Sequence, residues 1–138
     1  MKNIGNTIEE DYTLVTSICK ILETYHDTQD DPFIIGYLTG IAAGLQEIHN
    51  IKPGDSSFSK IIEGMIKMFD ELYGEANGKL ALGLYAVEMQ DGRTDEFNMG
   101  MSEGSDWCVL YLRGVSDEPV MPTELIMYLS MNHKSKKS

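Results

Sequence analysis

The sequence predicts an α+β fold in which three N-terminal helices and a C-terminal helix pack on one face of a three-stranded antiparallel meander. Up to about residue 72, apolar residues recur at intervals of three and four, as in amphipathic helices. From residue 79 they alternate, and turn residues such as Asp91-Gly92 separate the alternating runs. The 138 residues suffice for one hydrophobic core. We therefore expect one acidic domain over residues 1–133 and a disordered basic tail over 134–138.

Capping signals mark the starts of the three N-terminal helices. Residues 7–10 (Thr-Ile-Glu-Glu) form a capping-box pattern ahead of a helix that is expected to reach residue 25. Asp31 is placed as the N-cap of the second helix, and Pro32 follows at the first helical position, where its missing N–H costs nothing. A serine at 56 or 57 is expected to cap the third helix, and Gly74 to end it.

Three glycines lie four residues apart in the second helix, at Gly36, Gly40 and Gly44. Each costs a helix about 1 kcal/mol relative to alanine, so something has to offset the loss. Close approach of another backbone is the simplest reason. That backbone belongs to this fold or to a second copy across a dimer axis; the alternative is a ligand lying against the bare helix.

Residues 79–89, 97–101 and 107–113 are expected to form the strands, and Thr123 to cap the last helix. Alternation assigns each strand residue to one face of the sheet. One face is expected to form the core under the helices. Its residues are Leu80, Leu82, Leu84, Phe97, Met99, Met101, Cys108, Leu110 and Leu112.

The opposite face of the predicted sheet brings aromatic rings, one amide and one cation together. The candidate binding residues there are Tyr85, Asn98, Trp107, Tyr111 and Arg113. A small, polar central strand between aromatic neighbours leaves a shallow recess suited to a planar ligand or to the side chains of a partner. The alternative is that this face is covered by the remaining helix or by a second subunit.

The charge of the chain limits its partners. Net charge is −11, and it is −14 before residue 134, because 22 acids there face 8 basic residues. Such a surface repels phosphate backbones and anionic lipid, so direct binding to nucleic acid or to a membrane is not expected. The N-terminus lacks a signal-peptide core and no apolar run reaches membrane-spanning length, so a cytoplasmic location is expected. Cys19 and Cys108 lie in apolar segments and are expected to be buried free thiols.

Motifs that carry catalysis are missing from the sequence: it has no GxSxG, P-loop, HExxH or EF-hand pattern. We therefore expect no catalytic residue, no metal ligand and no cofactor. One exception is weighed, a magnesium-dependent hydrolase with a carboxylate cage between antiparallel helices. Its acids are Glu63, Asp70 and Glu71 on the third helix with Glu9 or Glu10 on the first.

The function expected from these patterns is non-catalytic capture or inhibition of another protein. Inhibitors, immunity proteins and phage counter-defence proteins are small acidic domains of this kind, and negative charge steers them to basic surfaces. A protein that binds or sequesters a nucleotide-like anion on the aromatic sheet face is the first alternative, and the magnesium-dependent hydrolase is the second. We also expect a homodimer or a higher oligomer.

Overall fold

Helices take the place of the expected sheet. The computed structural model describes residues 7–114 and 121–136, and within these ranges the β-structure is a single isolated bridge between Tyr25 and Ser135. None of the described helices is both long and apolar enough to cross a membrane. The prediction of a meander, and with it of an α+β fold, is wrong. The described helices are α1 (Ile8–Val15), α2 (Ser17–Leu22), α3 (Pro32–Ile48), α4 (Phe58–Asp91), α5 (Asp95–Arg113) and α6 (Thr123–Asn132).

The capping predictions for the first two helices are confirmed. The Thr7 hydroxyl accepts from the Glu10 N–H, and the Glu10 carboxylate accepts from the Thr7 N–H. Asp31 caps α3 by accepting from the Phe33 N–H, with Pro32 at the first helical position. The predicted first helix breaks at Thr16 into α1 and α2.

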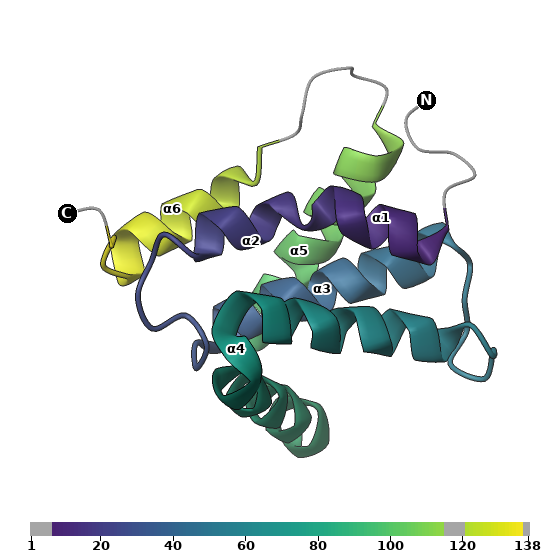
Figure 1. Ribbon diagram of the computed structural model, residues 1–138, viewed down its shortest axis with the longest axis horizontal. Coiled ribbons are helices and arrows are strands. Elements are labelled where there is room, and N and C mark those ends of the chain that lie inside the picture. Colours follow the sequence, from purple (N-terminus) through teal and green to yellow (C-terminus); the bar gives the residue numbers. More distant parts are fainter. Residues whose placement is uncertain (1–6, 115–120, 137–138) are drawn as a thin grey trace.

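The centre of the fold is a close pair of helices, α3 and α5, which Figure 1 shows crossing behind α1 and α4. Three glycines of α3 face α5, namely Gly36, Gly40 and Gly44. A Cβ on Gly36 would collide with the carbonyl oxygen of Phe97, and one on Gly44 would lie 3.0 Å from the Cβ of Cys108. The two backbones therefore approach more closely than helices with side chains at these positions can.

Helix α5 supplies glycines of its own to this contact. A Cβ on Gly100 would collide with the carbonyl oxygen of Phe33, and a Cβ on Gly104 with that of Tyr37. Both glycines are buried. Because small residues face backbone on each side of the pair, α3 and α5 lock together in one register.

Helix α4 bends sharply at Gly74, whose φ of +81° and ψ of 163° are not helical. Gly74 was expected to end this helix; instead the chain turns there and resumes as a helix over residues 75–91, which we call the α4 arm. Figure 1 shows the arm extending away from the other helices. At its far end the Glu88 carboxylate accepts from the N–H of Thr94 at 2.6 Å, which holds the turn into α5.

The three predicted strands lie in the α4 arm and in α5, so their assignment to sheet faces is also wrong. Leu80, Met99 and Leu110, all expected in the core, are 63%, 61% and 56% exposed. The arm instead turns Gly78, Ala81 and Glu88 inward. Because Gly78, Ala81 and Glu88 are small or charged, the buried face of the arm does not show in the apolar periodicity. The alternation of Leu80, Leu82 and Leu84 therefore determined the prediction of a strand.

The chain end packs beside the start of α3. Tyr128 of α6 stacks on Phe33, with ring centroids 4.0 Å apart. Of the expected basic tail, residues 134–136 are described. The Lys134 carbonyl accepts from the His26 N–H, and the Lys136 N–H donates to the Thr24 carbonyl. Residues 137–138 lie outside the described part of the chain.

Candidate functional site

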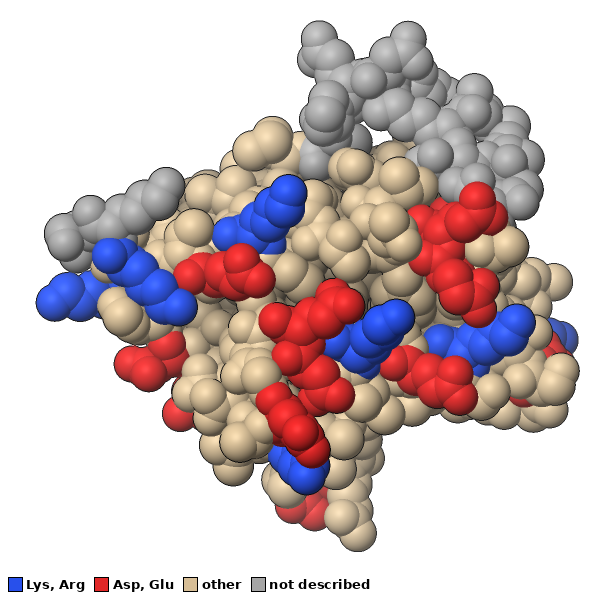
Figure 2. Space-filling model, viewed as in Figure 1, with Lys and Arg blue, Asp and Glu red and all other residues tan. Residues whose placement is uncertain are grey.

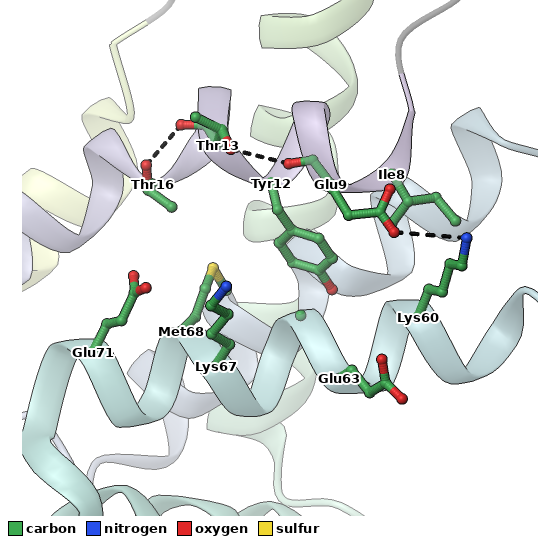
Figure 3. Close-up of a pocket in the computed structure, with 11 residues that line it drawn as sticks. Ile8, Glu9, Tyr12, Thr13, Thr16, Lys60, Glu63, Lys67, Met68 and Glu71 are labelled. Atoms are coloured by element: carbon green, nitrogen blue, oxygen red, sulfur yellow. Dashed lines mark hydrogen bonds and ion pairs between the residues drawn. The ribbon is translucent and has the colours of Figure 1, made fainter.

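A groove between α1 and the first half of α4 is the candidate functional site (Figure 3). Its volume is about 270 Å³. Helix α1 and the residue that follows its end contribute Ile8, Glu9, Tyr12, Thr13 and Thr16, and α4 contributes Lys60, Glu63, Gly64, Lys67, Met68 and Glu71. The groove is therefore built by two helices that lie far apart in the sequence, one at residues 8–15 and the other beginning at residue 58.

The floor of the groove is apolar and depends on a glycine. The Tyr12 ring lies over Gly64, and a Cβ on Gly64 would sit among the atoms of that ring. The Tyr12 hydroxyl donates to the Ile61 carbonyl oxygen at 2.5 Å, which fixes the ring across the two helices. Burial raises the pKa of the Tyr12 phenol above its ordinary value, so the hydroxyl stays a donor. Met68 continues this floor, since it is 2% exposed.

The rim of the groove carries charges of both signs. Lys60 reaches across from α4 to Glu9 of α1, with 3.7 Å between ammonium and carboxylate. The pKa of the Glu9 carboxyl is lowered, chiefly because the carboxylate accepts a hydrogen bond from the backbone N–H of Glu9 itself, and further by the positive charge of Lys60. Lys67 and Glu71 rise from α4 toward α1 (Figure 3). Figure 2 shows this face of the molecule with basic side chains set among more numerous acidic ones.

The helical acids weighed for a magnesium cage are distributed along this groove and around it. Glu9, Glu63 and Glu71 line it, whereas Asp70 lines a separate cavity beside the α4 arm. Within residues 7–114 and 121–136, no three His, Cys, Asp or Glu side chains are grouped so as to hold a metal ion. Lys60 and Lys67 stand among the acids of the groove, and they supply positive charge there.

A smaller cavity of about 150 Å³ lies between α5 and the start of α6. Three carboxylates line it, those of Glu103, Asp106 and Glu124. Burial and then the negative charges of Glu124 and Asp106 raise the pKa of Glu103 above its ordinary value. Trp107, one of the sequence-predicted binding residues, forms part of its wall.

The sequence-predicted binding residues do not share one recess. Trp107 and Tyr111 do lie together, with ring centroids 5.2 Å apart, but Trp107 is 5% exposed. The Arg113 guanidinium donates to the Ile48 carbonyl and so joins the ends of α3 and α5. Asn98 is exposed near the other end of α5, about 22 Å away along the helix. Tyr85 is half-buried in the α4 arm.

Sequence reasoning missed Tyr12 and Gly64 as a unit. Tyr12 falls in the first predicted helix and Gly64 in the third, and neither residue was singled out. A glycine inside a strongly helical pattern is a usable signal, because its cost to the helix implies a close contact. Its contact with a residue 52 positions earlier in the chain is set by tertiary packing alone.

Chemically, the groove offers an apolar floor framed by hydroxyl and charged groups, an arrangement typical of protein-binding surfaces. Burial raises the pKa of the Cys19 thiol to about 11 and that of the Cys108 thiol to about 12, so both cysteines are poor nucleophiles near neutral pH. Comparison with protein-family models, with curated proteins and with solved structures finds no match for this chain.

Proposed function

We propose that this chain is a non-catalytic protein that captures and inhibits another protein with a basic surface. The groove between α1 and α4 receives an amphipathic segment of that partner. The observation that carries the proposal is the groove itself, where the Tyr12 ring and Met68 form an apolar floor between charged rims. The groove, with a volume of about 270 Å³, is concave and has room for side chains of a docked segment.

Charge supports a basic partner. Three glutamates and two lysines line the groove, and the whole chain carries a net charge of −11. A field of that sign speeds the approach of a basic surface, and the apolar floor then supplies the contact that holds it. We also propose the cytoplasmic location expected from the sequence. Two free cysteines are compatible with it, because the reducing cytosol keeps thiols from forming disulfides.

Affinity capture with a matched charge control tests the proposal. The bait is the full chain, and the groove variant is Glu63→Lys with Glu71→Lys. The control is Glu23→Lys with Glu47→Lys, two exposed acids outside the groove, so both variants change the net charge equally. Thermal unfolding and circular dichroism verify that all three proteins are folded.

We expect a discrete protein to be retained from a lysate of the source cells by the unmodified chain and by the control, and lost with the groove variant. With that partner purified, added salt should slow association far more than it speeds dissociation. The proposal fails if no discrete protein is retained, if the groove variant retains it equally well, or if salt leaves the association rate unchanged.

A further inference from the structure

The α4 arm carries an apolar face that no described part of the molecule covers. We define the outer face of the arm as Ala76, Leu80, Gly83 and Val87, which are spaced four, three and four residues apart. Leu80 is 63% exposed and Val87 is 52% exposed. The opposite side of the arm, with Gly78, Ala81 and Glu88, is the side that is buried. A spacing of four and three is that of a helix–helix seam.

Three of the four outer-face residues, Leu80, Gly83 and Val87, lie within the longest uncharged stretch of the arm. Residues 80–87 contain no ionisable side chain except the half-buried Tyr85. The Glu88 carboxylate that follows accepts a hydrogen bond from the Thr94 N–H. A basic partner finds no acid to pair with on these two turns. Two copies of a chain with a net charge of −11 repel each other, and this stretch is where they meet at the lowest electrostatic cost.

The outer face is complementary to itself when two arms pack antiparallel. In that arrangement Leu80 of one copy lies over Gly83 of the other, and Val87 lies over Ala76, so each large residue meets a small one. Space is available at the small positions, because a Cβ on Gly83 would have no neighbouring atom within 4 Å.

We propose that the outer face of the α4 arm binds a second copy of this chain, forming an antiparallel helix pair about a two-fold axis. The 17-residue arm is about 25 Å long. A pair of such helices buries less area than the roughly 1,200 Å² at which stable complexes begin. The dimer is therefore weak and forms at high protein concentration, and it leaves the α1–α4 groove, on the other half of α4, open.

Sedimentation equilibrium of the full chain from about 10 µM to about 1 mM tests this inference. We expect a reversible monomer–dimer equilibrium, and Leu80→Lys should weaken it at least tenfold. Met131→Lys is the matched control, because it replaces another exposed apolar residue, 78% exposed on α6, with the same charge. A chain that stays monomeric throughout, or a dimer that Leu80→Lys leaves intact, overturns the proposal.

Disulfide trapping tests the orientation. A mixture of Leu80→Cys copies with Gly83→Cys copies should give mostly mixed disulfide dimers under mild oxidation, since these positions face each other across the two-fold axis. A parallel pair would give mostly like-with-like dimers and would contradict the antiparallel arrangement. The native cysteines, Cys19 and Cys108, are buried and add little background.

The dimer and the proposed capture of a basic protein respond to salt in opposite directions. Added salt screens the repulsion between two acidic copies, so the dimer should tighten, whereas capture should slow. Failure of one proposal therefore leaves the other standing. A dimer that weakens as salt is added contradicts its assignment to the uncharged stretch of the arm.

Discussion

Gly40 of α3 lies against the backbone of α5 at Met101, so closely that a Cβ on Gly40 would collide with the Met101 carbonyl oxygen and lie 2.9 Å from the Ser105 nitrogen. Gly40→Ala should therefore destabilise the fold, because backbone cannot move aside as a flexible side chain can. We expect a loss of about 2–3 kcal/mol in the free energy of unfolding, measured by urea denaturation.

Gly83→Ala is the matched control for that experiment. Gly83 also lies inside a helix, but nothing lies within 4 Å of an added Cβ. Alanine there should raise the free energy of unfolding by up to about 1 kcal/mol, through helix propensity alone. Equal effects of the two substitutions would contradict the close packing of α3 on α5.

The starts of the first two helices were predictable because capping is local, whereas Thr123, expected to cap the last helix, is its first helical residue, and Pro122 stands at the N-cap. Thr7 with Glu10, and Asp31 with Pro32, act within one turn of each other, so the sequence displays the whole interaction. The register between α3 and α5 was not predictable. Gly104 falls between the strands predicted at 97–101 and 107–113, whereas in the structure it lies inside α5 and packs against the Tyr37 backbone. A glycine at a helix–helix contact lets the two backbones approach closely, but it has no side chain that would appear in the apolar periodicity of the sequence.

The candidate site was harder to predict than the fold. Trp107 and Tyr111 were singled out as neighbours on one sheet face, and they are neighbours because four residues make one helical turn. The groove on α1 and α4 rests on Tyr12 meeting Gly64, a pair joined by tertiary packing. Sequence periodicity places each residue on a side of its helix and does not say which helices meet.

The Tyr12–Gly64 contact predicts a coupled pair of substitutions. Gly64→Ala should destabilise the fold by about 1–3 kcal/mol, because its methyl group occupies the position of the Tyr12 ring. In a Tyr12→Ala background the same substitution should be neutral or stabilising, since the space is then free. Urea denaturation of the four proteins checks this. Equal effects in both backgrounds would contradict the placement of the ring.

The buried thiols and phenols predict a loss of stability at alkaline pH. Burial raises the pKa of Cys19 to about 11 and of Cys108 to about 12, from an ordinary value of 9.0, and raises the pKa of Tyr37 and Tyr73 above their ordinary 10.0. The unfolded chain therefore loses these protons first as the pH rises. The stability linked to them is fully present below pH 9 and declines as the pH rises from 9 toward 12.

Urea denaturation between about pH 7 and pH 11 measures this decline. The double variant Cys19→Ala with Cys108→Ala is the control, and its decline should begin nearer pH 10, where the tyrosines ordinarily titrate. In parallel, both thiols should react slowly with a thiol reagent in the folded protein at pH 8 and rapidly in urea. A free energy of unfolding that is constant up to pH 11 would contradict the burial of these groups.

The Asp31 carboxylate joins α3 to α6. It accepts from the Phe33 N–H and from the Tyr128 hydroxyl, and the His133 Nε2 lies 2.6 Å from its Oδ2. The other ring nitrogen of His133 donates to the His26 carbonyl oxygen, since a carbonyl can only accept. One carboxylate thus caps a helix and holds the C-terminal helix in place.

A double-mutant cycle on this carboxylate should show coupling. Tyr128→Phe and His133→Ala each remove one partner of Asp31, and each should cost about 1–2 kcal/mol of unfolding free energy. Because both partners act on the same group, their combined effect should depart from the sum by about 0.5 kcal/mol or more. Tyr128→Phe combined with Tyr12→Phe, which removes a hydrogen bond to Ile61 elsewhere, should instead be additive. Additivity in the first cycle would show that Tyr128 and His133 do not share Asp31, and α6 would then be held chiefly by the stacking of Tyr128 on Phe33.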